Sequence, residues 1–223
     1  MNGWATTANI WASLQPSHNC IMYDMSQYST YEHLNAFFLE LPVSSQPITI
    51  IGWSWGAMVS LELAYKFPQK INKLILISGT AKFINDNDYV YGTEKAAVKN
   101  LSDKVRQNPL LAQKAFYKQM FSPAERTARN IFFKTCIPDI LVTNNLSLQT
   151  GLNYLLTKDL RKILPFIKVP TQIIHGTDDI ICPFSAAEYL HKALPDSQLA
   201  VLPCCGHIPF FTQRSICQKL LFK

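Results

Sequence analysis

The chain has 223 residues, 48% of them hydrophobic, which suffices for one core domain carrying a sizeable insertion. It has no apolar run of the roughly 18 to 20 residues that a membrane helix needs and no signal-peptide pattern, so we expect a cytoplasmic protein without a membrane partner. The net charge of +6 is compatible with several kinds of partner, but the basic residues are spread out and lack the aromatic-interleaved stripe of a nucleic-acid binder.

Alternating strand and helix patterns favour an α/β fold, in which a mostly parallel sheet is flanked by helices. In chain order, the predicted strands are residues 20–23, 48–53, 73–77, 171–175 and 198–202. The predicted helices around them are residues 31–41, 54–67, 183–193 and 212–221.

Residues 80–165 differ from the rest, because strand patterns disappear and amphipathic helical segments follow one another. Residues 110–121 and 124–135 have apolar side chains at helical spacing, and Asp103, Ser122 and Pro123 stand where caps and breaks are expected. We therefore predict an inserted helical cap at 80–165, with residues 1–79 and 166–223 forming the core.

The cysteines show no paired C-x-x-C spacing, which argues against a zinc site and against a disulfide framework. Free thiols are therefore expected, and the sequence predicts neither a metal nor a cofactor. The residues are Cys20, Cys136, Cys182, Cys204, Cys205 and Cys217.

The most informative motif is Gly52-Trp53-Ser54-Trp55-Gly56, which joins an apolar strand directly to a helix-forming segment. A strand that turns at once into a helix forces the serine into a strained backbone conformation, and the residues two before and two after it must lack a bulky Cβ. The pattern is typical of a nucleophile elbow, although a lone Gly-x-Ser-x-Gly also occurs by chance in ordinary loops.

A serine nucleophile needs a base and a group that orients the base. His207 follows the last predicted strand and Asp179 follows the one before it, so the order is serine, aspartate, histidine, as in α/β-hydrolases. Asp179 is preferred because it has glycine three residues before it and proline four after it; Asp178 is the alternative and is otherwise a loop-capping carboxylate. The other histidines, His18, His33, His175 and His191, are interpreted as structural or surface residues.

A tetrahedral intermediate also needs two backbone N–H donors. Trp55, which follows the serine, is the first. Trp4 is nominated as the second, because Asn2-Gly3-Trp4-Ala5 resembles the His-Gly-Trp-Gly turn of related hydrolases, with asparagine and alanine as departures from it.

Together these segments resemble the α/β-hydrolase superfamily over the whole length and, more narrowly, the pimeloyl-acyl-carrier-protein methyl ester esterases of biotin synthesis. The narrower resemblance rests on the elbow and on further segments: Gly3-Trp4 followed by Trp11, Asp159-Leu160-Arg161 leading to Val169-Pro170, and Gly206-His207-Ile208-Pro209-Phe210. Chains of this fold usually have two or three strands before the segment that begins here at Met1. We therefore expect that the first strands of the usual fold are missing, which would expose a sheet edge.

The resemblance implies a carboxylesterase that cleaves the methyl ester of a dicarboxylate carried on acyl carrier protein, through an acyl-enzyme. It implies substrate contacts by Trp4, Trp53, Tyr117, Phe121, Phe132 and Phe133, although helical aromatic residues are more often plain core. It also implies that basic residues dock the acidic carrier, and the candidates are Arg126, Arg129, Lys134 and Arg161, each equally open to interpretation as a solvated charge. The alternatives are a broad-specificity short-chain esterase or other capped hydrolase, and a catalytically impaired binding protein.

Overall fold

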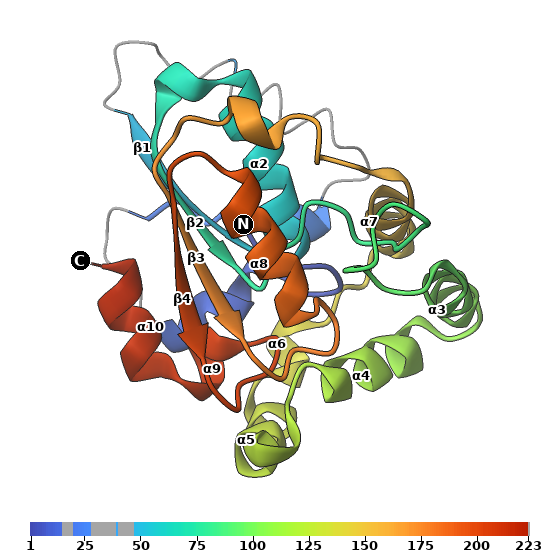
Figure 1. Cartoon of the computed structure of the whole chain (residues 1–223). Coiled ribbons are helices and arrows are strands. Elements are labelled where there is room, and N and C mark those ends of the chain that lie inside the picture. Colours follow the sequence, from blue (N-terminus) through green and yellow to red (C-terminus); the bar gives the residue numbers. More distant parts are fainter. Residues whose placement is uncertain (15–19, 28–38, 40–46, 223) are drawn as a thin grey trace.

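The central feature is a parallel sheet of four strands in the order β1-β2-β3-β4 (Figure 1). The computed structural model describes residues 1–14, 20–27, 39 and 47–222. The strands are β1 Ile48–Trp53, β2 Ile71–Ile77, β3 Thr171–Gly176 and β4 Ser197–Leu202. The α/β fold and the four corresponding predicted strands are confirmed.

β2 shows why this sheet forms. It lies between β1 and β3, and its last four residues, Leu74 to Ile77, are completely buried. A continuous run of aliphatic residues suits a parallel strand that is covered on both faces. Its register with β1 pairs Trp53 with Ile77, so the two strands end side by side just before Ser54.

Helices cover the sheet. α2 packs against β1 and β2, and α8 packs against β3 and β4. In Figure 1, α8 lies in front of the sheet, while η1, in dark blue beside α10, lies behind it. The bounds are η1 Ala8–Leu14, η2 Met25–Gln27, α2 Trp55–Lys66, η3 Pro68–Lys70, η5 Leu164–Phe166, α8 Phe184–Ala193, α9 Pro209–Thr212 and α10 Arg214–Leu221. The predicted helix 212–221 is thus α10, separated from α9 by the non-helical Gln213.

Between β2 and β3, residues 95–157 are mostly helical, as predicted, whereas residues 78–94 form turns and isolated bridges. The elements are α3 Lys95–Gln107, α4 Pro109–Gln119, η4 Pro123–Glu125, α5 Arg126–Thr135, α6 Ile137–Ile140 and α7 Asn145–Thr157. Figure 1 shows α4, α5 and α6 beyond the arrowheads of the strands, with α3 and α7 to one side. Asp103 lies inside α3 and caps nothing, whereas the side chain of Asn108 caps α4. That residues 80–165 act as a cap domain stays a prediction.

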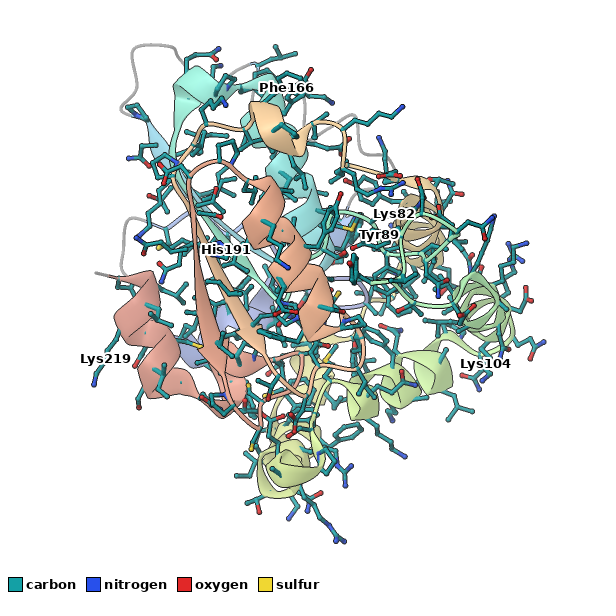
Figure 2. All side chains as sticks on the ribbon, in the orientation of Figure 1. Lys82, Tyr89, Lys104, Phe166, His191 and Lys219 are labelled. Atoms are coloured by element: carbon teal, nitrogen blue, oxygen red, sulfur yellow. The ribbon has the colours of Figure 1, made fainter. Side chains whose placement is uncertain are left out.

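The two ends of this helical segment meet. Lys82 pairs with Asp159 in an antiparallel bridge, and the N–H of Leu160 donates to the carbonyl of Ala81 at 2.9 Å. The ammonium of Lys82 also lies 5.9 Å from the ring centre of Tyr89, and Figure 2 shows the two side chains next to each other. The segment therefore leaves and rejoins the sheet at one place.

Two expectations for the N-terminal part have different outcomes. The strand predicted at 20–23 is wrong, because these residues pair with no described strand and the side chain of Ile21 is 79% exposed. A short apolar run becomes a strand only where a neighbour supplies backbone partners. On the edge of β1 that faces away from β2, the partner among the described residues is Met1. The N-terminal ammonium of Met1 donates to the carbonyl of Ile51, and the carbonyl of Met1 accepts from the N–H of Trp53. The helix predicted at 31–41 lies outside the described residues, apart from Leu39.

Among the described residues, no helix combines the length and the apolar character needed to cross a membrane.

Candidate active site

Ser54 lies at the junction of β1 and α2, in the conformation expected of an elbow. Its φ of 56° and ψ of −118° are strained for a residue with a side chain. The surroundings hold this conformation: the N–H of Ser54 donates to the carbonyl of Ile77 at 2.9 Å, and the carbonyl of Ser54 accepts from Ala57 at 3.0 Å. The end of β2 and the start of α2 together fix the serine.

The two glycines of the motif allow neighbouring backbone atoms to approach them closely. A Cβ on Gly52 would lie 2.5 Å from the carbonyl oxygen of Gly56 and 2.8 Å from the Cα of Ala57. A Cβ on Gly56 would lie 2.6 Å from the carbonyl oxygen of Met1. Real Cβ atoms do not come so close to backbone, so glycine at 52 lets α2 begin directly after β1, and glycine at 56 lets the N-terminal residues pack against the start of α2.

His207 and Asp179 meet at the carboxyl end of the sheet. The Nδ1 atom of His207 lies 2.7 Å from Oδ2 of Asp179, and both side chains are fully buried. They meet because they follow β4 and β3, which are adjacent parallel strands. A carboxylate can only accept here, so Nδ1 carries the proton, and Nε2 of His207 has no hydrogen-bond partner among the described residues. This is the state a general base needs before it takes a proton.

The environment of Asp179 keeps it ionised. Its Oδ1 accepts from the N–H groups of Ile181 at 2.9 Å and Cys182 at 3.0 Å. Burial alone would raise the pKa of this carboxyl, but His207 and His175 outweigh burial and hold the pKa well below its usual value. Asp178 is different: it is partly exposed and accepts from the hydroxyl of Thr177 at 2.8 Å. The structure therefore pairs His207 with Asp179.

The turn that contains Trp4 lies against the elbow. A Cβ on Gly3 would lie 3.2 Å from the Cβ of Ser54. Asn2, the departure from the His-Gly-Trp-Gly pattern, braces this turn: its Nδ2 donates to the carbonyl of Thr6, and its Oδ1 accepts from the N–H of Met25 at 2.8 Å. The indole of Trp4 donates to the carbonyl of Leu148 at 2.8 Å. Trp4 and Trp55 remain the predicted oxyanion donors.

The aromatic residues expected to contact substrate make contacts within the protein. Trp53 is fully buried, and its indole donates to the carbonyl of His207 at 2.7 Å. Tyr117 is fully buried and donates to the carbonyl of Ala5. Phe132 is fully buried between neighbouring aromatic rings, whereas Phe133 is partly exposed. The structure thus joins these residues into the core that supports the site, and substrate contact by them stays a prediction.

The four basic residues expected to dock the acyl carrier differ in their ion pairs. The guanidinium of Arg161 is held by Asp159 at 2.6 Å and by Asp88 at 3.3 Å. Arg126, Arg129 and Lys134 lie on α5, and none of them makes an ion pair with a residue that the structure describes.

His175, expected to be a structural or surface residue, is completely buried beside Asp179. Its Nε2 lies 2.8 Å from the carbonyl of Cys182 and 3.4 Å from Oδ2 of Asp179. Two imidazoles therefore face one carboxylate oxygen. The available signal was its place four residues before Asp179, at the end of the same strand.

Comparison with known proteins assigns the chain to a family. A family model described as the alpha/beta hydrolase fold matches residues 6–213. The chain therefore belongs to the α/β-hydrolase fold family. A solved structure of an esterase from Exiguobacterium antarcticum covers 98% of this chain and 87% of its own with a TM-score of 0.76, at 24% sequence identity, and so agrees in fold.

Two similar curated proteins share the name pimeloyl-acyl-carrier-protein methyl ester esterase. The one from Nitrosospira multiformis is 31% identical over 169 residues, which span 73% of this chain but only 62% of that protein. The one from Vibrio vulnificus is 26% identical over 235 residues, spanning 99% of this chain and 91% of that protein.

Proposed function

We propose that the chain is a serine carboxylesterase in which Ser54 is the nucleophile, His207 the general base and Asp179 the residue that orients His207. One observation carries this proposal: the 2.7 Å contact between His207 and Asp179 lies at the same edge of the parallel sheet as a serine held at a φ of 56°. Strain at a non-glycine residue persists only where the surroundings impose it, and it clusters at functional sites.

The reaction follows from these positions. Ser54 Oγ attacks the ester carbonyl while Nε2 of His207 takes its proton, and Asp179 stabilises the imidazolium that forms. The backbone N–H groups of Trp55 and Trp4 receive the negative charge of the tetrahedral oxygen. His207 then returns the proton to the leaving alcohol, and a water activated by His207 cleaves the acyl-enzyme.

The proposed substrate is the methyl ester of pimeloyl-acyl-carrier protein, with methanol as the leaving alcohol. The shared name of the two relatives supports this choice. Charge supports it independently: residues 80–165 hold 13 of the 21 Lys and Arg but seven of the 15 Asp and Glu, so this segment accounts for the entire net charge of +6. An excess of positive charge confined to one segment suits an acidic macromolecular partner.

Within that segment, α5 is the proposed docking helix. Its ten residues include Arg126, Arg129 and Lys134 and no carboxylate. Arg126 and Arg129 are three residues apart and so lie on one face of the helix. Arg161 is set aside as a docking residue, because two carboxylates already hold its guanidinium.

The first experiment measures hydrolysis of p-nitrophenyl butyrate. We expect turnover by the wild type and loss of about 10⁴-fold or more in Ser54→Ala. Hydrolysis that persists in Ser54→Ala would refute the proposed nucleophile, and absence of turnover with every ester in the wild type would favour a binding protein.

The second experiment compares kcat/KM for the carrier-linked methyl ester and for free monomethyl pimelate at low and high salt. Arg126→Glu with Arg129→Glu should slow only the carrier-linked substrate, and chiefly at low salt. The matched control reverses two exposed lysines on other helices, Lys192 on α8 and Lys219 on α10, and gives the same change in net charge. Equal rates for the two substrates would favour a short-chain esterase without a carrier.

A further inference from the structure

The loop that presents His207 is attached to a distant part of the chain, the turn between α4 and α5. The N–H of His207 donates to the carbonyl of Met120 at 2.8 Å. The N–H of the preceding residue, Gly206, donates to Oε2 of Glu125 at 2.9 Å. Two successive peptide groups at the catalytic histidine are therefore bonded to the helical segment rather than to the sheet.

Glu125 holds both sides of this junction with a single oxygen. Its Oε2 also accepts from the N–H of Ser122 at 2.8 Å, which completes the capping box that begins η4 and leads directly into α5. The hydroxyl of Ser122 in turn donates to the carbonyl of Cys204 at 2.8 Å, in the loop before His207. The start of the docking helix and the histidine loop thus share the same carboxylate.

The junction is also tightly packed. A Cβ on Gly206 would lie 2.5 Å from the carbonyl oxygen of Met120 and 2.8 Å from the N–H nitrogen of Ser122. Beside it, the rings of Phe132 on α5 and Phe211 on α9 meet edge to face at 5.2 Å. A displacement of the α4–α5 turn would therefore displace the backbone of His207.

We propose that Glu125 is a positioning residue for His207: it fixes the imidazole relative to Ser54 and links it to α5. The proposal rests on the proposed function, in which His207 is the base and α5 the docking helix. Displacing a catalytic group by about 1 Å costs up to about 100-fold in rate, so loss of this attachment lowers kcat without contact between Glu125 and substrate.

Capping alone does not account for this arrangement. Asn108 caps α4 by accepting from the N–H of Leu111 at 3.0 Å, and it is exposed and makes no hydrogen bond to the histidine loop among the described residues. Glu125 instead places one oxygen between two segments, while its other oxygen, Oε1, is buried without a partner among the described residues. Asn108 is therefore the matched control for the loss of a helix cap.

The test measures kcat and KM for p-nitrophenyl acetate, together with thermal unfolding, in Glu125→Ala, Glu125→Gln and Asn108→Ala. Glu125→Ala should lower kcat about 10- to 100-fold with little change in KM. Glu125→Gln should recover most of this loss, because its amide oxygen can still accept from Gly206 and Ser122. Asn108→Ala should lower the unfolding temperature but leave kcat as in the wild type.

Wild-type kcat in folded Glu125→Ala would overturn the proposal, and so would an equal loss of kcat in Asn108→Ala. If Glu125→Ala does not fold, Glu125→Asp replaces it in the test. The shorter side chain keeps the carboxylate but moves its oxygens away from the N–H groups of Gly206 and Ser122. Wild-type kcat in this variant would also overturn the proposal. Failure of the proposed function is distinguishable, since hydrolysis would then survive Ser54→Ala.

Discussion

The elbow and the histidine loop supply two parts of one proposed site, but they are positioned in different ways. Ser54 is fixed by its own motif, the end of β2 and the first turn of α2. His207 is fixed by partners at sequence separations of 28 for Asp179, 81 between Gly206 and Glu125, and 154 for Trp53. The nucleophile is thus held largely by its own motif and by β2, and the base by contacts with more distant segments, so variants far along the chain should act on the base.

The largest effect expected on the histidine side comes from Asp179→Asn. The variant removes the charge that stabilises the imidazolium and favours the wrong tautomer, so kcat should fall about 10³- to 10⁴-fold. Asp178→Asn is the matched control, since Asp178 contacts Thr177 and not His207. Steady-state hydrolysis of p-nitrophenyl butyrate measures both, and a larger loss in Asp178→Asn would mean that the acid has been misassigned.

On the elbow side, Gly56→Ala tests the close approach of the N-terminal turn to the elbow. The new Cβ would be pressed against the carbonyl oxygens of Met1 at 2.6 Å and Asn2 at 2.7 Å, so the turn with Trp4 must move away from Ser54. If Trp4 supplies an oxyanion donor, kcat should fall about 10²- to 10³-fold. Circular dichroism checks that the variant is folded, and folded protein with unchanged kcat would remove Trp4 from the oxyanion hole.

A smaller effect is expected from His175→Phe. This change removes the second imidazole from Oδ2 of Asp179 while filling the same buried volume, and it should lower kcat about tenfold through misplacement of the carboxylate. His191→Phe is the control, because His191 is exposed on α8. Comparable kcat values for the two variants would show that His175 only fills space.

The smallest effect concerns acid stability. Asp179 has a pKa below its unfolded value, so its stabilising contribution is complete above about pH 4 and is lost as the pH falls toward the folded-state pKa. Urea unfolding measures this between pH 5 and 3. As the pH falls, the free energy of unfolding should decrease in the wild type by up to about 1.4 kcal/mol per pH unit more than in Asp179→Asn. An equal pH dependence of the free energy of unfolding in the two proteins would contradict the low pKa of Asp179.

The same contrast explains what the sequence could predict. The strands from 48 onward, the elbow and the Ser54-Asp179-His207 assignment depend on apolar runs and short motifs, which are visible in the sequence. The strand expected at 20–23 failed because pairing depends on a neighbour. The contacts of Glu125 and His175 could not be predicted, because nothing local marks a carboxylate that reaches Gly206, or an imidazole that reaches Asp179 inside the fold.

The central claim is that Ser54 is a nucleophile activated by a histidine that long-range contacts hold in place. Reaction with a fluorophosphonate, followed by peptide mass spectrometry, tests it most directly. The account predicts one adduct, on Ser54, formed rapidly in the wild type, slowly in Glu125→Ala and slower still in Asp179→Asn. An adduct on another residue, or equal labelling rates in all three proteins, would contradict it.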